Sequence, residues 1–177
     1  MIITETKLGG VWLIEPQRFE DARGFFAPSF SAEEFAARGM ASQFAEHNIS
    51  YSRKCGTLRG MHYQSPPRGQ AKLVRCTRGA IFDVVVDLRQ DSPTFRQWVG
   101  TELTAENRRM LYLPGDCAHG FQTLADDTEV FYMVSEVYAP DSGRGVRWDD
   151  PAFGIEWPEA EERVVIARDA GYPDFAP

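Results

Sequence analysis

The sequence predicts an all-β protein with short peripheral helices, built as an antiparallel sandwich or barrel. Two observations lead to this fold class. Short segments with a residue period of two recur along the chain, and turn signals such as Arg78-Gly79 and Pro114-Gly115 separate them. Only one segment has a clear helical pattern, so strands that alternate with helices in a parallel sheet are not expected.

The clearest candidate strand is residues 81–88, IFDVVVDL, which has one apolar face and a second face that carries Asp83 and Asp87. Residues 129–137 alternate in the same way, with Phe131 on one face and Tyr132 on the other. Further strands are predicted at residues 10–16, 58–64, 71–77, 109–114 and 119–124.

The helical segment is residues 31–39, SAEEFAARG. Ser31 is placed to cap its first turn, Glu34 follows at the capping-box spacing, and Gly39 ends it. No repeat or linker interrupts the chain, and the last residues are irregular and rich in proline. At this length roughly two thirds of the unfolded surface can be buried, so we expect residues 1–177 to form a single domain.

Composition and charge exclude several classes of protein. A formal net charge of -7 argues against nucleic-acid binding, which depends on a broad basic surface. No apolar run approaches the roughly 20 residues of a membrane helix, and the N-terminal residues lack the features of a secretion signal. The cysteines, Cys55, Cys76 and Cys117, form no CxxC pair and are expected to be free and mostly buried, which fits the cytoplasm.

Five polar or charged residues fall on strand positions predicted to face inward: His62, Lys72, Asp83, His119 and Tyr132. A charge or an imidazole on a buried sheet face is costly unless it is paired or solvated by a cavity. The residues that share the strand face of Lys72 and of Tyr132 are apolar, so turning these faces outward would expose an apolar stripe. Small barrels can enclose one ligand, and we expect a polar pocket here.

Arg59 lies on the opposite face of its strand from His62. Both side chains can serve one site only if Gly60 supports a bulge or a bend, which a glycine within a strand often marks.

Metal binding is the alternative use of His62 and His119. The spacing that places two imidazoles on one strand face is absent, because Gln64 lies two positions after His62, and no third ligand stands out. The sequence also has no nucleophile elbow and no Cys-His signature. We therefore expect neither a metal site nor covalent catalysis.

Acid-base chemistry fits the remaining residues. A neutral His62 could act as a base, Tyr132 as an acid across the pocket, and Lys72 as a fixed positive charge. This constellation suits removal of a proton from a carbon next to a carbonyl group, because the cation stabilises the enolate oxygen. Reprotonation from the opposite face inverts the carbon, which is epimerisation and needs no cofactor.

Longer stretches resemble the dTDP-4-dehydrorhamnose 3,5-epimerase family, in order and over nearly the whole chain. They are DARGFF (21–26), HNISYSRKCGTLRGMHYQ (47–64), residues 71–98, LTAENRRMLYLP (103–114), AHGF (118–121), VYAP (137–140) and WDDPAFGIEWP (148–158). The resemblance implies a cupin-type jelly-roll barrel, a homodimer, and a thymidine-diphosphate-linked 4-keto-6-deoxyhexose as substrate.

The resemblance also implies roles for individual residues. His62 would be the general base, Tyr132 the general acid and Lys72 the group that polarises the C4 ketone, while Asp169 would orient the histidine. Without the resemblance, Asp169 would pass for an exposed residue of the tail. The implied substrate-binding positions are Arg23 and Arg59, for the diphosphate, together with Phe26, Asn48, His119, Tyr138 and Arg168.

The sequence departs from the family pattern at peripheral positions. Pro28 and Gly143 stand where the family often has Glu, Arg168 where it usually has Lys, and Asp116 where it has Gly. Three functional hypotheses therefore stay open: inversion of both C3 and C5, inversion of only one of them with altered nucleotide specificity, or sugar-nucleotide binding without turnover.

Overall fold

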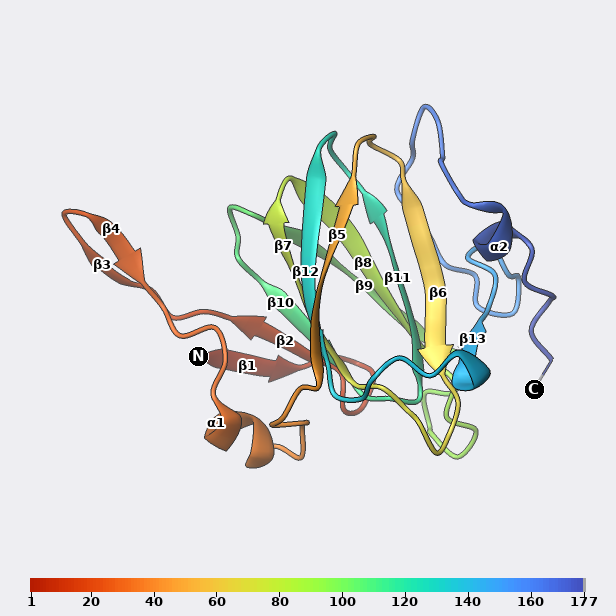
Figure 1. The fold of residues 1–177 in the computed structure, drawn as a ribbon, viewed down its shortest axis with the longest axis horizontal. Helices are drawn as coiled ribbons and strands as arrows, with labels where there is room; N and C mark the ends of the chain where they lie inside the picture. Colours follow the sequence, from red (N-terminus) through yellow and green to blue (C-terminus); the bar gives the residue numbers. More distant parts are fainter. Residues whose placement is uncertain (177) are drawn as a thin grey trace.

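The computed structural model, which describes residues 1–176, consists of two antiparallel β-sheets packed face to face (Figure 1). One sheet has the strand order β1 (Ile2–Glu5), β2 (Trp12–Glu15), β10 (Met110–Leu113), β7 (Lys72–Arg78), β12 (Thr128–Val134) and β5 (Glu46–Ser52). The other has the order β13 (Gly143–Gly145), β6 (Leu58–Gln64), β11 (Cys117–Thr123), β8 (Ala80–Asp87) and β9 (Trp98–Thr104). The predicted all-β jelly-roll architecture is confirmed.

The main core lies between the two sheets. Side chains from both inner faces meet there, among them Val74 on β7, Val130 on β12 and Val85 on β8. The position of β8 confirms that Asp83 faces inward: Asp83 and Asp87, which share one face of the strand, are both fully buried on the inner face.

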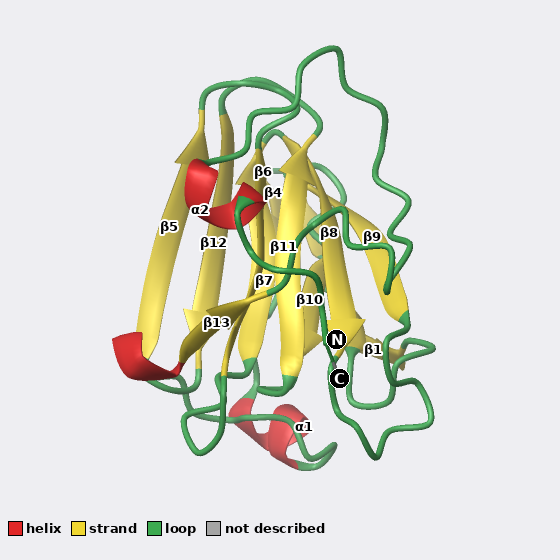
Figure 2. Ribbon diagram, turned by 90° about the vertical axis from the view of Figure 1, so that its right-hand side faces the viewer, coloured by secondary structure: helices red, strands yellow, loops and turns green. Residues whose placement is uncertain are grey.

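The outer face of β8 is covered by the chain after β13. Val84 and Val86 pack against Phe153 and Trp157 of this segment, which contains almost no regular structure. In Figure 2 the segment runs as a long loop over the five-stranded sheet and carries the short helix α2 (Ala167–Ala170). The fold thereby brings residues near position 169 next to β6.

The bulge expected at Gly60 is present. His62 pairs with His119 and Arg59 with Phe121, so two residues of β6 stand opposite the single Gly120 of β11. Gly60 has a φ of 143°, and a Cβ atom there would lie 2.5 Å from the Cα atom of Gly120. Because of the extra residue in the bulge, the side chains of Arg59 and His62 lie on the same face of β6, and both line the same pocket.

Helix α1 (Ala32–Ala36) is shorter than predicted but begins where expected. The Ser31 hydroxyl accepts a hydrogen bond from the Glu34 backbone amide over 3.3 Å, and Phe35 is fully buried. The strand predicted at residues 129–137 is too long at its end, because β12 ends at Val134 and Val137 lies outside it. The structure also contains a short 3-10 helix, η1 (Pro140–Ser142).

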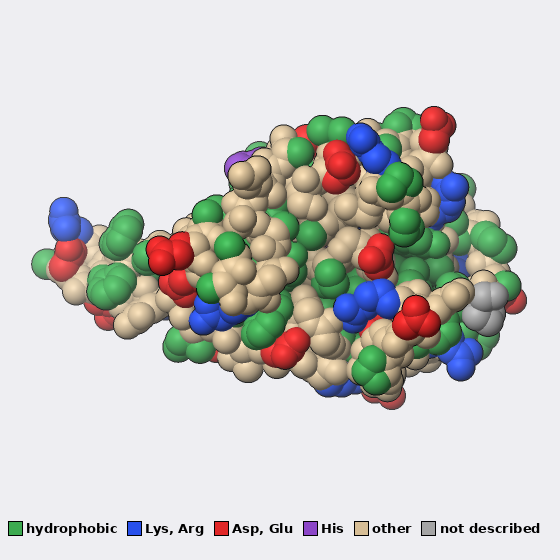
Figure 3. All heavy atoms as spheres, turned by 90° about the horizontal axis from the view of Figure 1, so that it is seen from below, with side chains coloured by type: hydrophobic (Ala, Val, Ile, Leu, Met, Phe, Trp, Pro, Cys, Tyr) green, Lys and Arg blue, Asp and Glu red, His purple; other side chains and the backbone are tan. Residues whose placement is uncertain are grey.

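A hairpin of β3 (Phe19–Asp21) and β4 (Gly24–Phe26) projects away from the sandwich (Figure 1). Figure 3 shows it as an arm with hydrophobic side chains on its surface; Phe19 is 56% exposed and Phe26 is 69% exposed. Arg23, near its tip, pairs only with Asp21 of the same hairpin among the described residues.

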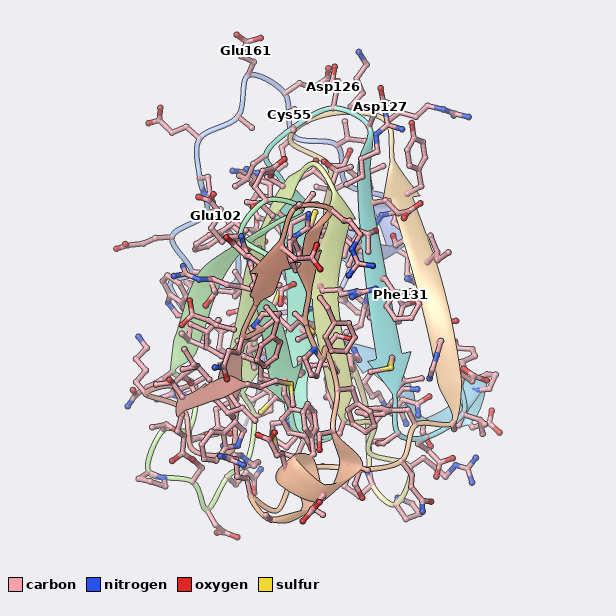
Figure 4. The ribbon with its side chains drawn as sticks, turned by 90° about the vertical axis from the view of Figure 1, so that its left-hand side faces the viewer. Cys55, Glu102, Asp126, Asp127, Phe131 and Glu161 are labelled. Atoms are coloured by element: carbon pink, nitrogen blue, oxygen red, sulfur yellow. The ribbon has the colours of Figure 1, made fainter. Side chains whose placement is uncertain are left out.

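At one end of the sandwich the β5–β6 and β11–β12 loops meet, where Figure 4 labels Cys55, Asp126 and Asp127. The Cys55 backbone amide donates to Asp126 Oδ1 over 2.8 Å, which ties the two loops together. Cys76 and Cys117 are buried, as expected, whereas Cys55 is exposed. Across residues 1–176 no helix has the length and apolar character that a membrane crossing requires.

Candidate active site

A pocket of about 560 Å³ opens between the sheets on the side where β6 and α2 lie. Four of the five residues predicted to face inward line it: His62, Lys72, His119 and Tyr132. Asp83 is the fifth, and it lies behind His119, fully buried. The volume lies within the range of small-molecule sites, and the lining combines apolar area with a few convergent polar groups.

His62 and Asp169 form a hydrogen-bonded pair. His62 Nε2 lies 2.8 Å from Asp169 Oδ1, and the Gly60 backbone amide donates to Asp169 Oδ2 over 3.2 Å. The Asp169 side chain is only 1% exposed, so its orientation is fixed by these partners and by packing. An ionised Asp169 can only accept, so Nε2 carries the hydrogen and Nδ1 is left as the basic nitrogen of a neutral imidazole.

Burial and hydrogen bonding tune this pair in opposite ways. Burial lowers the pKa of His62, and the hydrogen bond and charge of Asp169 offset this only in part. Burial by itself would raise the pKa of Asp169, but the hydrogen bonds from His62, Gly60 and Arg168 hold it below its usual value. At neutral pH the pair therefore consists of a carboxylate and a mostly uncharged imidazole.

Lys72 reaches the pocket from β7 and is 8% exposed. Its Nζ donates to the backbone carbonyl of His62 over 3.2 Å, which holds the ammonium group close to the histidine. Burial lowers the pKa of Lys72 to about 8, and the negative charge of Asp83 opposes this decrease. Lys72 is thus still mainly an ammonium group at pH 7.

A second His-Asp pair lies on the neighbouring strand. His119 Nε2 lies 2.8 Å from Asp83 Oδ1, and His119 stands directly opposite His62 across the β6–β11 ladder. Asp83 Oδ2 is buried and has no hydrogen-bond partner within residues 1–176. From this buried position Asp83 acts electrostatically on Lys72.

Tyr132 enters the pocket from β12, where it pairs with Val74 of β7 and Asn48 of β5. Burial raises the pKa of the Tyr132 hydroxyl, and the charge of Arg59 moderates the increase. The phenol therefore stays protonated throughout the physiological range and is available as a proton donor.

The remaining predicted binding residues divide into two groups. Arg59, Tyr138 and Arg168 line the pocket, and Asn48 lies beside Tyr132 on the adjacent strand without lining it. Arg23 and Phe26 are not brought to the pocket, because both lie on the projecting hairpin.

Several pocket residues were not predicted from the sequence. The ring of Tyr172 lies 6.3 Å from that of His62 in an edge-to-face arrangement. It fills the space above Gly145, where a Cβ atom would come within 2.2 Å of the Tyr172 ring. The other unpredicted polar residues are Ser50, Thr57, Tyr63, Gln64, Gln70 and Arg144. Of these, Tyr63 and Gln64 share β6 with His62. Their closeness to His62 in the sequence was the only feature that could have predicted their place in the pocket lining.

Gly143, one of the departures from the family pattern, also lines the pocket, next to Tyr138. Among residues 1–176 no group of three or more His, Cys, Asp and Glu side chains is arranged to hold a metal ion.

Comparison with known proteins identifies the family. A family model described as dTDP-4-dehydrorhamnose 3,5-epimerase matches residues 5–177. The dTDP-4-dehydrorhamnose 3,5-epimerase of Sinorhizobium fredii is 43% identical over 175 residues, covering 99% of this chain and 90% of that protein.

Two solved structures are similar over nearly the whole chain. One is a dTDP-6-deoxy-D-glucose-3,5-epimerase from Legionella pneumophila in complex with dTDP-4-keto-L-rhamnose (39% identity, TM-score 0.90, 97% of this chain and 90% of that one). The other is ChmJ, a 3′-monoepimerase from Streptomyces bikiniensis in complex with dTDP-quinovose (38% identity, TM-score 0.88, 96% of this chain and 85% of that one). The chain therefore belongs to the dTDP-4-dehydrorhamnose 3,5-epimerase family of sugar-nucleotide isomerases.

Proposed function

We propose that this protein is a cofactor-independent epimerase that inverts C3 and C5 of a dTDP-4-keto-6-deoxyhexose. One observation carries the proposal: His62, backed by the buried carboxylate of Asp169, lines the same pocket as Lys72 and Tyr132. Relatives that act on or bind dTDP-linked sugars supply the substrate class.

In the first step, Nδ1 of the neutral His62 removes the proton from the carbon next to the C4 ketone. The C–H bond breaks and its electron pair moves to the ketone oxygen, which becomes an enolate. Lys72 stabilises that oxygen as an ammonium group, and Asp169 stabilises the imidazolium that forms. The lowered pKa of His62 favours the free base before the reaction.

In the second step, the Tyr132 hydroxyl delivers its proton to the opposite face of the enolate and the ketone is restored. The carbon is now inverted, His62 has gained one proton and Tyr132 has lost one. Exchange with solvent returns both residues to their starting states. Repetition at the second carbon completes the reaction, because C3 and C5 flank the same ketone.

We further propose that the protein works as a homodimer. The projecting hairpin carries Arg23 and Phe26, which are expected to bind the substrate; both are exposed, and neither lines this chain's own pocket. In a dimer the hairpin would reach the pocket of the partner, where a guanidinium group suits the diphosphate and an aromatic ring suits the base.

Solvent isotope exchange tests the proposal. Incubation with dTDP-4-keto-6-deoxyglucose in D₂O, followed by NMR, is expected to show deuterium at both C3 and C5. H62A is expected to lose about 10²- to 10⁴-fold in exchange rate, whereas Y132F exchanges but forms little epimerised product. H47A is the control, because His47 is exposed on β5 outside the pocket. Tight binding of the sugar nucleotide without exchange at either carbon contradicts turnover.

A monoepimerase is the second candidate, favoured by the similarity to ChmJ. The same base and acid serve either reaction, so the number of inverted carbons depends on how the sugar can turn in the pocket. Deuterium at C3 alone would identify this reaction, whereas deuterium at both carbons would exclude it.

A further inference from the structure

Two charged side chains, Asp169 and Arg168, meet beside the imidazole of His62. Arg168 Nε donates to Asp169 Oδ1 over 3.1 Å, and this is the same oxygen that lies 2.8 Å from His62 Nε2. Arg168 Nη2 lies 3.3 Å from His62 Nε2. One carboxylate oxygen therefore serves two donors, and the guanidinium donor is charged at every relevant pH.

We propose that Arg168 is a positioning residue for the His62–Asp169 pair, a role beyond the substrate binding that the family resemblance implies. The guanidinium edge formed by Nε and Nη2 faces the pair, and Arg168 lines the pocket beside it. By sharing Oδ1 it fixes the carboxylate and disfavours a second positive charge on the adjacent imidazole. This inference rests on the proposed function, in which neutral His62 is the base.

Other groups also act on His62, and none duplicates this contact. Asp169 opposes Arg168, because its negative charge favours the imidazolium, whereas Lys72 acts in the same direction as Arg168 from β7. The remaining titratable or charged groups that share the pocket with His62 are Arg59 on the same strand, Tyr63 beside it, His119 on β11, Tyr132 on β12, Tyr138, Arg144 on β13 and Tyr172 after α2.

The sign of the expected effect follows from the charge. Removing the guanidinium makes protonation of His62 easier, so the pKa of His62 rises. Because the base is active only when neutral, kcat/KM then falls on the acid side of the profile and is unchanged where His62 is deprotonated in both enzymes. The Arg168 side chain is 62% exposed, so the effect is partly screened and shrinks as salt is added.

The experiment compares Arg168→Gln with Arg168→Lys and measures kcat and KM from pH 5 to pH 9. The acid limb of kcat/KM in R168Q is expected to move up by roughly half to one pH unit, a loss of about three- to tenfold on that side. R168K keeps the charge and is expected to keep the limb close to that of the parent enzyme. R144Q is the matched control: it removes one positive charge from the same pocket, but the hydrogen bonds of Arg144 go to the Asp141 and Gly143 carbonyls.

An NMR titration of His62 in the free protein gives a readout that does not depend on activity. The His62 pKa is expected to rise in R168Q and to stay in place in R144Q, even if the substrate were misassigned. Two results would overturn the inference: a rise in KM of equal size at every pH with an unchanged His62 titration, which assigns Arg168 to the substrate, or a shift in R168K as large as in R168Q.

Discussion

The pocket and the projecting hairpin contrast sharply in how their side chains are held. At the pocket, Asp169 in the wall and Asp83 behind it are buried, and each is hydrogen-bonded to a histidine. On the hairpin, Phe19 and Phe26 are exposed, and Arg23 finds its ion-pair partner within the hairpin itself. Burial and a rigid sheet preorganise the first set, whereas Phe19 and Phe26 stack on each other and Arg23 pairs with Asp21, all within the hairpin.

This difference separates two tasks. Proton transfer depends on groups held within a fraction of an ångström, and the chain supplies all of the proposed groups from β6, β7, β12 and α2. Nucleotide binding tolerates less rigidly held side chains. In the proposed dimer, the hairpin of the second protomer completes the nucleotide-binding site. Substitutions in the two regions should therefore change different kinetic constants.

The largest effect is expected for Asp169→Asn. The amide keeps the shape but can donate to Nε2, so the imidazole loses the tautomer that leaves Nδ1 basic and loses its counter-charge. By analogy with other histidine-carboxylate pairs, kcat should fall about 10²- to 10⁴-fold with little change in KM. Steady-state kinetics check this, with circular dichroism to verify folding. A variant with near-normal kcat would remove Asp169 from the mechanism.

A smaller effect is expected for Asp83→Asn. In the parent enzyme kcat/KM should rise as His62 loses its proton, at a pH below its usual pKa, and should fall above about pH 8 as Lys72 loses its proton. The charge of Asp83 raises the pKa of Lys72, so its removal should shift the alkaline limb to lower pH and reduce kcat/KM by roughly tenfold at pH 8.

Asp87→Asn is the matched control for this shift. Asp87 is equally buried on the same strand, but its partners are Arg89, Ser92 and Thr94, outside the pocket. D87N should lower the melting temperature without moving the alkaline limb. If the alkaline limb of the kcat/KM profile is unchanged in D83N, deprotonation of Lys72 is not the cause of that limb.

The smallest effect is expected for Arg23→Ala on the hairpin. Loss of one guanidinium contact to the diphosphate should raise KM by roughly tenfold and leave kcat nearly unchanged. The proposed dimer can be tested by mixing H62A subunits with R23A subunits. In a mixed dimer, one site combines the intact pocket of the R23A subunit with the intact hairpin of the H62A subunit, so this site should be active. Assays of the mixed subunits, compared with each variant alone, would show this gain, and its absence would argue against an exchange of hairpins.

Much of the sandwich could be predicted from the sequence, because alternation and turn residues act locally. The bulge at Gly60 was also predictable, since only a bulge lets Arg59 and His62 share a site. The inward position of Asp83 was predictable as well. The burial of the outer face of β8 under Phe153 and Trp157 was not, because alternation does not say whether a face meets water or another segment of the chain. Likewise, the burial of Asp169 depends on how an irregular segment folds back onto β6, and a local pattern carries no information about that contact.

The two glycines at the bulge also limit how this enzyme can vary. A side chain at Gly120 would meet Met61 Sδ at 2.7 Å and the Arg59 carbonyl at 2.8 Å, and one at Gly60 would meet Gly120 itself. A change at Gly60 cannot be compensated by a change at Gly120, or the reverse, because a side chain at either position needs the space that the backbone of the other occupies. In a randomised library both should stay glycine in every active clone, so mutagenesis aimed at new sugar specificity should leave this pair untouched and concentrate on the rim of the pocket.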